Sequence, residues 1–253
     1  MKTILRLLLR LWFRFRAHNE AVLKTPGPVL LIPNHASWID WLFLGVCLED
    51  DWRFVTSSQM VKTSGWLRRK IIDNKRTFPV DTSSPYAARR MAEFLNQGGR
   101  LVLFAEGRLT ITGAFMKLFE GTGFLLHKTG AKVITCYLRN INRVRWVRHK
   151  GWTEWFPQVT AHFSDPITPP RLQNVPNTKA RQTLTTWLRD TMLRQQFDVE
   201  TEFGPANVLE AIVETARHIP GKTILEDATG TALSYRRLLL GADLLAGDFS
   251  RRF

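Results

Sequence analysis

Short apolar runs alternate with amphipathic helical patterns along most of this chain. Runs with the composition of buried strands occupy residues 29–32, 53–56, 77–80, 101–104, 133–137 and, as a further candidate, 158–163. Helical periodicity occupies residues 38–48, 61–72, 85–96, 115–127 and 178–197. This alternation predicts an α/β fold with a mostly parallel central sheet flanked by helices.

Composition excludes several protein classes. The chain has only two cysteines, Cys47 and Cys136, neither of them in a Cys/His cluster, so we expect neither a disulfide scaffold nor a zinc or other metal site. No apolar run reaches the about 18–20 residues that cross a bilayer. Lysine and arginine total 36 against 22 acidic residues, a net charge of +14, and the excess lies before residue 200. An anionic partner is therefore expected: nucleic acid, an anionic lipid surface or an acidic protein.

The N-terminal segment MKTILRLLLRLWFRFRA combines arginine at every fourth position with large apolar residues. This mixture is typical of an amphipathic helix that lies in a membrane surface. The repeated charges interrupt the apolar stretch that a signal peptide requires. The residues expected at the membrane surface are Arg6, Arg10, Trp12, Arg14 and Phe15. The alternative is an ordinary helix that packs on the body of its own protein.

The sequence NHASWID follows the first predicted strand and contains His35 and Asp40. Residues five apart point away from each other on a continuous helix, so these two can meet only at a turn. Ser37 and Asp40 have the spacing of a capping box, which would leave His35 in the loop before the helix. An Asp–His pair of this kind can act as a general base. The alternative is that Asp40 is only a helix cap.

A second charged motif, AEGRLT, follows the predicted strand 101–104. It brings an acid, a glycine and an arginine to the carboxyl end of a strand, where ligands bind in open α/β sheets. The alternative is a salt-bridged turn between Glu106 and Arg108. Two charged motifs at one edge of a sheet favour a single shared site.

The blocks NHASWID and FAEGRLT, in this order, resemble the signature of the glycerolipid acyltransferases, which include 1-acylglycerol-3-phosphate acyltransferase. The resemblance covers residues 25–165. It implies transfer of a fatty acyl group from a thioester of acyl carrier protein or coenzyme A to a lysophospholipid hydroxyl, without a cofactor. It also implies that His35 is the general base and that Asp40 orients it. The implied substrate-binding residues are Asp81, Glu106, Gly107, Arg108 and Thr110.

One segment departs from the family pattern. Members commonly have an Asp–Arg pair that binds a phosphomonoester, whereas this chain has Asp81 followed by Thr82. Arginine makes bidentate bonds to phosphate that threonine cannot replace. This favours 2-acyl-glycerophosphoethanolamine over lysophosphatidic acid as the acceptor. Lys75 and Arg76 could compensate, so formation of phosphatidic acid is the alternative.

Residues 201–253 resemble the opening of adenylate-forming acyl ligases, where a short hairpin precedes a helix, through the segment EDATGTALSYRRL. These residues are too few for a ligase domain and lack a nucleotide loop, so we expect no ATP-dependent activation. An acyltransferase followed by a ligase is the order of bifunctional enzymes that combine 2-acylglycerophosphoethanolamine acyltransferase with acyl-[acyl carrier protein] synthetase. The alternative is a helical appendage that packs on the first domain.

These interpretations divide the chain into an interfacial helix (1–24), an acyltransferase domain (25–200) and an incomplete ligase-like region (201–253). Basic and aromatic residues mixed between Arg139 and Phe156 suggest a second contact with the membrane, with a solvated basic loop as the alternative. We expect a peripheral enzyme at the cytoplasmic face of the inner membrane. Nucleic acid is not an expected partner, because it gives the two charged motifs no role. A catalytically silent lipid-binding protein is the competing hypothesis.

Overall fold

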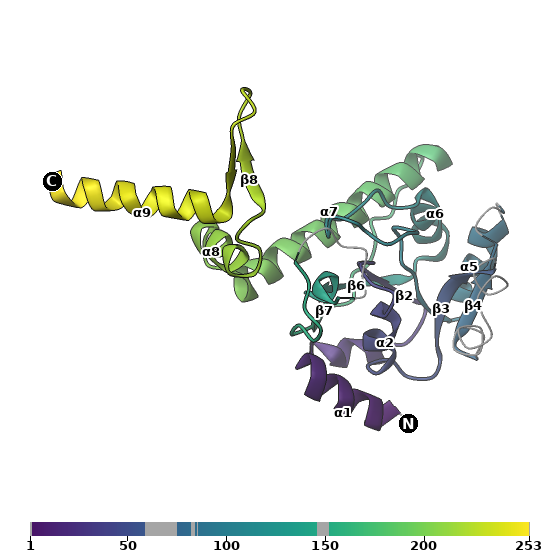
Figure 1. The fold of residues 1–253 in the computed structure, drawn as a ribbon. Helices are drawn as coiled ribbons and strands as arrows, with labels where there is room; N and C mark the ends of the chain where they lie inside the picture. Colours follow the sequence, from purple (N-terminus) through teal and green to yellow (C-terminus); the bar gives the residue numbers. More distant parts are fainter. Residues whose placement is uncertain (1, 59–74, 82–83, 85, 146–151, 253) are drawn as a thin grey trace. The chain divides into compact units, whose positions relative to one another are not determined.

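A computed structural model describes residues 2–58, 75–81, 84, 86–145 and 152–252 (Figure 1). The chain forms two compact units, Met1–Phe197 and Asp198–Phe253. Each unit is described by itself. Among the described residues, none of the helices combines the length and the apolar character required to cross a membrane.

A seven-stranded sheet forms the centre of the first unit, in the order β1-β7-β6-β2-β5-β3-β4. The strands are β1 (Arg16–His18), β2 (Val29–Pro33), β3 (Trp52–Ser57), β4 (Thr77–Val80), β5 (Arg100–Val102), β6 (Lys132–Arg139) and β7 (Thr160–Phe163). β6 and β7 pair antiparallel, and the other neighbouring strands pair parallel. The predicted α/β fold with a mostly parallel sheet is confirmed.

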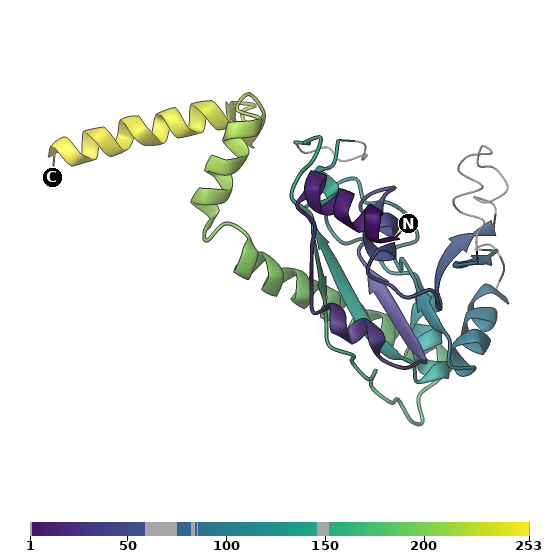
Figure 2. The same cartoon turned by 90° about the horizontal axis from the view of Figure 1, so that it is seen from below.

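Helices cover both faces of this sheet (Figures 1 and 2). They are α1 (Lys2–Phe13), α2 (Asp40–Gly45), α5 (Tyr86–Asn96), α6 (Glu120–Thr129) and α7 (Asn177–Phe203), with short 3-10 turns at Glu20–Lys24 and Ile141–Arg143. Val29 and Leu31 of β2 belong to a core that includes residues of α1 and α2. Leu30 and Ile32 belong to a second core with residues of α5, α6 and α7. β2 is therefore covered on both sides, which explains its uninterrupted apolar sequence.

Three predicted helices have other limits in the structure, among them the helix expected at 178–197, which is the longer α7, and a fourth falls on residues that the structure does not describe. The helix expected at 38–48 is the shorter α2, and the helix expected at 115–127 starts only at Glu120. The later start has a tertiary cause, because the amide of Phe119 donates to the carbonyl of Ala105 at 2.8 Å and holds the preceding loop against the segment that follows β5. The helix expected at 61–72 lies outside the described residues.

The segment 1–24, expected as a separate membrane helix, is structurally part of the first unit. Leu9 and Phe13 of α1 are buried in the first core, and residues 16–18 form the edge strand β1, which pairs with β7. Phe15, expected at the membrane surface, is only 2% exposed and packs edge-on against Phe43. The structure corrects that expectation: the chain turns after α1 to enter the sheet, and this turn carries Phe15 into the core.

The second unit contains α8 (Val208–His218), a hairpin of β8 (Thr223–Glu226) and β9 (Ala232–Ser234), and α9 (Tyr235–Arg252). Asp227 closes the hairpin turn, because its Oδ1 accepts hydrogen bonds from the amides of Thr229 and Thr231 at 2.8 and 2.9 Å. A hairpin followed by a helix is the arrangement expected for this segment. The resemblance to acyl ligases stays a prediction.

Candidate functional site

The two charged motifs lie at the same edge of the sheet. β2 and β5 are parallel neighbours, with Leu31 opposite Val102, so the loops that follow them leave at the same end. These loops also bind each other. The amide of His35 donates to Glu106 Oε1 at 2.9 Å, and the amide of Thr110 donates to the carbonyl of His35 at 3.0 Å. The structure thus brings the two motifs together, as one shared site requires.

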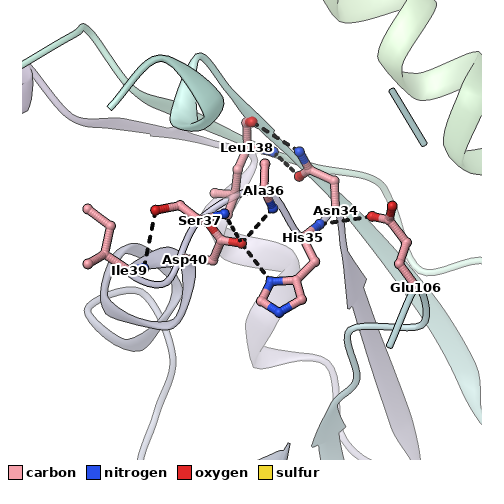
Figure 3. A network of polar contacts seen from close by, with 8 residues as sticks. All are labelled: Asn34, His35, Ala36, Ser37, Ile39, Asp40, Glu106 and Leu138. Atoms are coloured by element: carbon pink, nitrogen blue, oxygen red, sulfur yellow. Dashed lines mark hydrogen bonds and ion pairs between the residues drawn. The ribbon is translucent and has the colours of Figure 1, made fainter. Parts of the chain in front are cut away.

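His35 and Asp40 form a hydrogen-bonded pair at this edge (Figure 3). The distance from His35 Nδ1 to Asp40 Oδ2 is 2.8 Å, and the same oxygen accepts hydrogen bonds from the amides of Ala36 and Ser37 at 2.9 and 3.0 Å. A carboxylate can only accept, so Nδ1 carries the proton and Nε2 keeps its lone pair. The Asp40 side chain is 1% exposed and the His35 side chain 22%. The pair therefore has a buried acid and a base that solvent can reach.

The local sequence explains this geometry only in part as a capping box. The Asp40 carboxylate does reach back to the amide of Ser37, as expected. The reciprocal bond is absent among the described residues, because the Ser37 hydroxyl accepts from the amide of Ile39 at 3.3 Å. The helix then begins at Asp40 instead of directly after Ser37. The carboxylate consequently closes the turn that contains His35.

The environment of Asp40 acts on its protonation in two directions. Burial raises the pKa of Asp40 above its ordinary value, while the hydrogen bonds from His35, Ser37 and Ala36 lower the pKa and offset part of the rise. These three donors also fix the orientation of the carboxylate. Asp40 can therefore hold the His35 ring in one tautomer and stabilise a positive charge on it.

Both carboxylate oxygens of Glu106 accept hydrogen bonds from main-chain amides. Oε1 accepts from the amide of His35, and Oε2 accepts from the amide of Met116, each at 2.9 Å. Burial raises the pKa of Glu106, and these two bonds oppose the rise. The salt-bridged turn to Arg108, considered as an alternative, does not form among the described contacts of Glu106. Glu106 instead connects the His35 loop to the segment before α6.

The rest of the second motif shapes the loop. Gly107 has a φ of 66°, in the left-handed region that favours glycine. The Thr110 hydroxyl donates to the carbonyl of Ala114 at 2.9 Å and accepts from the amide of Gly113 at 3.1 Å, so it stabilises its own turn. Arg108 is exposed, and within the described residues it has no hydrogen-bond or ion-pair partner. Arg108 is therefore an exposed cation on the loop that binds the His35 loop.

Asp81 lies farther along the same edge. It follows Val80, the last residue of β4, and β4 is three strand positions from β2. Neighbouring strands are about 4.8 Å apart, which separates the ends of β4 and β2 by about 14 Å. The structure thus does not bring Asp81 next to His35 and the second motif.

Arg76 and Lys75 lie at the opposite edge, before the start of β4. The Arg76 guanidinium donates to the carbonyls of Gly45, Leu48 and Glu49 at 3.2, 3.3 and 3.1 Å, and so caps the end of α2. These bonds engage the Arg76 guanidinium away from His35, which speaks against the compensation considered for Arg76.

Two residues of the site received no role from the sequence. The ring of Phe104 lies against the His35 imidazole, with centroids 4.2 Å apart. The side chain of Asn34 binds the main chain of Leu138. Both residues stand inside the two motifs, at the first position of each quoted block, and this position was the available signal.

The predicted membrane-surface arginines have different environments. Arg6 is half-buried and paired with Glu20, its Nη1 donating to Oε1 at 2.9 Å, whereas Arg10 and Arg14 are exposed. α1 also carries large apolar side chains that are more than half exposed, namely Ile4, Leu7, Leu11 and Trp12. The helix therefore has one apolar face on the protein and a second one that is uncovered in the described structure.

The basic, aromatic segment before β7 lies next to α1. The guanidinium of Arg143 lies 4.1 Å from the ring centroid of Trp152, and that of Arg145 lies 4.7 Å from that of Trp155. Phe156 contacts Trp12, with centroids 5.7 Å apart. The part of this segment at 146–151 lies outside the described residues.

Neither cysteine is suited to act as a nucleophile. Both are buried, and burial raises the pKa of the Cys47 thiol to about 12 and that of Cys136 well above its ordinary value. They remain thiols, which are poor nucleophiles. In the described part of the chain, no group of three or more His, Cys, Asp or Glu side chains is placed to hold a metal ion.

Comparisons with known proteins give one family and one related fold. Residues 14–139, about half of the chain, match the family model described as Acyltransferase. This segment runs from before β1 to the end of β6 and contains both motifs. The fold is similar to the crystal structure of the 1-acyl-sn-glycerophosphate (LPA) acyltransferase PlsC from Thermotoga maritima. That match has a TM-score of 0.52 and 15% identity, and it covers 75% of this chain and 77% of the other. At this identity the likeness concerns the fold.

Proposed function

We propose that this chain, whose residues 14–139 match the acyltransferase family model, transfers a fatty acyl group from an acyl thioester to the free hydroxyl of a lysophospholipid. The observation that carries the proposal is the bond of 2.8 Å between His35 Nδ1 and Asp40 Oδ2. It leaves Nε2 as a base at the carboxyl edge of a mostly parallel sheet, where such folds bind their ligands.

The chain's own residues account for the proton transfers. Nε2 of His35 takes the hydroxyl proton while the hydroxyl oxygen attacks the thioester carbonyl, and a C–O bond forms. Asp40 stabilises the resulting imidazolium. The tetrahedral intermediate then collapses as the C–S bond breaks, and the leaving thiolate takes the proton from the imidazolium. The products are an acylated phospholipid and a free thiol, and His35 returns to its starting form.

Acceptor binding is assigned to the second motif. Arg108 is exposed on the loop whose Thr110 amide binds the carbonyl of His35, so its guanidinium can reach a phosphate close to the reacting hydroxyl. Glu106, Gly107 and Thr110 contribute by holding this loop in shape. Asp81, about 14 Å along the edge by strand spacing, is suited to a headgroup amine.

The activity is tested by release of free thiol from acyl carrier protein or coenzyme A thioesters, with and without lysophospholipid. Acceptor-dependent release with formation of diacyl phospholipid is expected, and the two thioesters compared side by side identify the donor. Release no faster than in buffer would contradict the proposed activity. If binding to liposomes persisted, that result would favour the catalytically silent lipid-binding alternative.

The headgroup of the acceptor is the next prediction. Thr82 stands where the family commonly has arginine, and Arg76 caps α2 at the other edge. We therefore expect a higher kcat/KM for 2-acyl-glycerophosphoethanolamine than for lysophosphatidic acid. Thr82→Arg should raise kcat/KM for lysophosphatidic acid by about tenfold, because one charge-assisted hydrogen bond contributes about that factor to binding. Ser83→Arg adds the same charge one residue later and serves as the control. A parent enzyme that prefers lysophosphatidic acid would show that its product is phosphatidic acid.

We further infer that α1 rests on an anionic lipid surface through Ile4, Leu7, Leu11 and Trp12, with the exposed Arg10 and Arg14 near the headgroups. The net charge of +14 favours such a surface. We propose that the enzyme is a peripheral protein at the cytoplasmic face of the inner membrane. Acidic acyl carrier protein would be attracted by the same charge.

Replacing Leu7 and Leu11 together with serine should weaken binding to phosphatidylglycerol liposomes by at least about tenfold. Burial of a leucine side chain contributes about 1.5–3 kcal/mol, and these two are 56% and 67% exposed, so the folded protein loses little. Leu240→Ser with Leu244→Ser, in α9, removes equally exposed leucines and is the matched control. Sedimentation with liposomes and thermal melting measure the two effects. Unchanged sedimentation of the α1 variant would show that this face does not contact lipid.

A further inference from the structure

The side chain of Asn34 extends the pairing of β2 with β6 beyond the end of β2 (Figure 3). The last paired residues are Pro33 and Cys136, and the amide of Asn34 still donates to the carbonyl of Cys136 at 3.2 Å. In a continuing parallel ladder, the amide of Leu138 would next donate to the main-chain carbonyl of Asn34. It donates instead to Asn34 Oδ1 at 2.7 Å, and Nδ2 donates to the carbonyl of Leu138 at 3.2 Å.

Because the side chain of Asn34 replaces its main-chain carbonyl as the partner of Leu138, the main chain can leave the sheet directly after β2. The carbonyl of Asn34 then turns with the loop. Asn34 is 8% exposed and Leu138 1%, so these polar groups depend on each other. A carboxamide fits this place, because Leu138 presents one donor and one acceptor, and a neutral amide answers both with a single planar group, as an ionised carboxylate cannot.

His35 is the next residue, and hydrogen bonds to the loop after β5 fix its main chain. Its amide donates to Glu106 Oε1 at 2.9 Å, and its carbonyl accepts from the amide of Thr110 at 3.0 Å. The main chain of His35 is therefore fixed between the loop after β5 on one side and β6 on the other. Only then can the bond to Asp40 fix the direction of the ring.

We propose that Asn34 is a positioning residue for His35. Its carboxamide binds the main chain of Leu138 and so fixes the end of β2. This fixes the main-chain position from which the His35 imidazole reaches both Asp40 and the acceptor. The proposal rests on the proposed function, because it takes His35 to be the base. A displacement of about 1 Å at a reacting group can lower a rate about 10²-fold, so loss of the Asn34–Leu138 hydrogen bonds should lower kcat. Asn34 itself is placed to touch neither substrate.

The experiment compares Asn34→Leu, which keeps the shape, and Asn34→Asp, which keeps the acceptor but loses the donor. The matched control is Gln195→Leu. Gln195 also bonds to the sheet from a half-buried amide, donating to the carbonyls of His162 at 2.9 Å and Thr135 at 3.4 Å, but it does so from α7 and away from the His35 loop. The measurements are kcat and both KM values per folded molecule, the melting temperature, and the proton resonance of the His35 Nδ1–H group.

Both Asn34 variants should lose about 10- to 100-fold in kcat with KM values close to those of the parent. Their Nδ1–H resonance should shift or broaden, and Gln195→Leu should lower the melting temperature while keeping kcat and the resonance. Parent values of kcat and the resonance in folded Asn34→Leu would overturn the proposal, as would an equal loss of kcat in Gln195→Leu. If Asn34→Leu does not fold, Asn34→Asp supplies the same comparison.

The resonance of the His35 Nδ1–H group tests the positioning role of Asn34 independently of the proposed enzymatic activity. If the parent shows no acyl transfer, the activity assignment fails, yet the His35 resonance still reports whether Asn34 positions the ring. An unchanged resonance in both Asn34 variants would then overturn the positioning role by itself.

Discussion

Replacing His35 with alanine is expected to lower the turnover of acyl transfer by about 10²- to 10⁴-fold, the usual loss on removing a general base. The bond of 2.8 Å from Nδ1 to Asp40 leaves Nε2 as the nitrogen that can take the acceptor proton. KM for the thioester should change little, because the base acts on the acceptor hydroxyl. Initial rates of thiol release and of product formation measure the effect.

His127→Ala is the matched control for this change. His127 lies in the last turn of α6, so the same substitution there removes an imidazole without touching the site. Far-ultraviolet circular dichroism verifies that both variants are folded. Near-parent turnover by folded His35→Ala would remove the proposed mechanism altogether.

Asp40→Asn should be similarly severe, on the order of 10²- to 10⁴-fold. The Asp40 carboxylate is buried and accepts three hydrogen bonds on one oxygen. A neutral amide cannot stabilise an imidazolium, and its NH₂ group facing Nδ1 would favour the wrong tautomer of His35. The same thiol-release assay applies, and turnover within a factor of a few of the parent would show that Asp40 only caps α2.

Stability provides an independent measurement on Asp40→Asn. The pKa of Asp40 is raised in the folded protein, so the unfolded state releases its proton at lower pH than the folded state does. The free energy of unfolding of the parent should therefore decline as the pH rises from the ordinary aspartate pKa to the raised value. Glu106, whose pKa is also raised, adds a decline of the same sign in both proteins. The difference between their urea-unfolding curves at several pH values reports the contribution of Asp40 together with the rise that the Asp40 charge adds to the pKa of Glu106, and equal pH dependence would contradict the raised pKa of Asp40.

Local sequence patterns predicted the limits of β2 to β7 to within about two residues, whereas β1 lies in the segment expected as a membrane helix. β4 has the predicted limits, and β2 extends only one residue further, to Pro33. The start of α6 could not be predicted, because hydrogen bonds from Met116 to Glu106 and from Phe119 to Ala105 decide it. Such bonds join residues whose proximity depends on the completed fold.

Periodicity also could not tell which apolar face of α1 belongs to the protein. Leu9 and Phe13 are buried, whereas Leu7 and Leu11 are exposed, although all four are large and apolar. In the site, spacing was sufficient to pair His35 with Asp40, because only a turn allows them to meet. The partner of Glu106 was not predictable, since a carboxylate binds a main-chain amide as readily as a ligand.

The anchors around His35 also constrain the length of the chain between them. Asn34 must reach Leu138, His35 must reach Glu106, and Asp40 must reach back to His35. One residue inserted or deleted between Pro33 and Asp40 would shift at least one of these partners out of reach. Related sequences should therefore keep the number of residues in this stretch even where its side chains vary, and accept insertions and deletions in other connections of the fold.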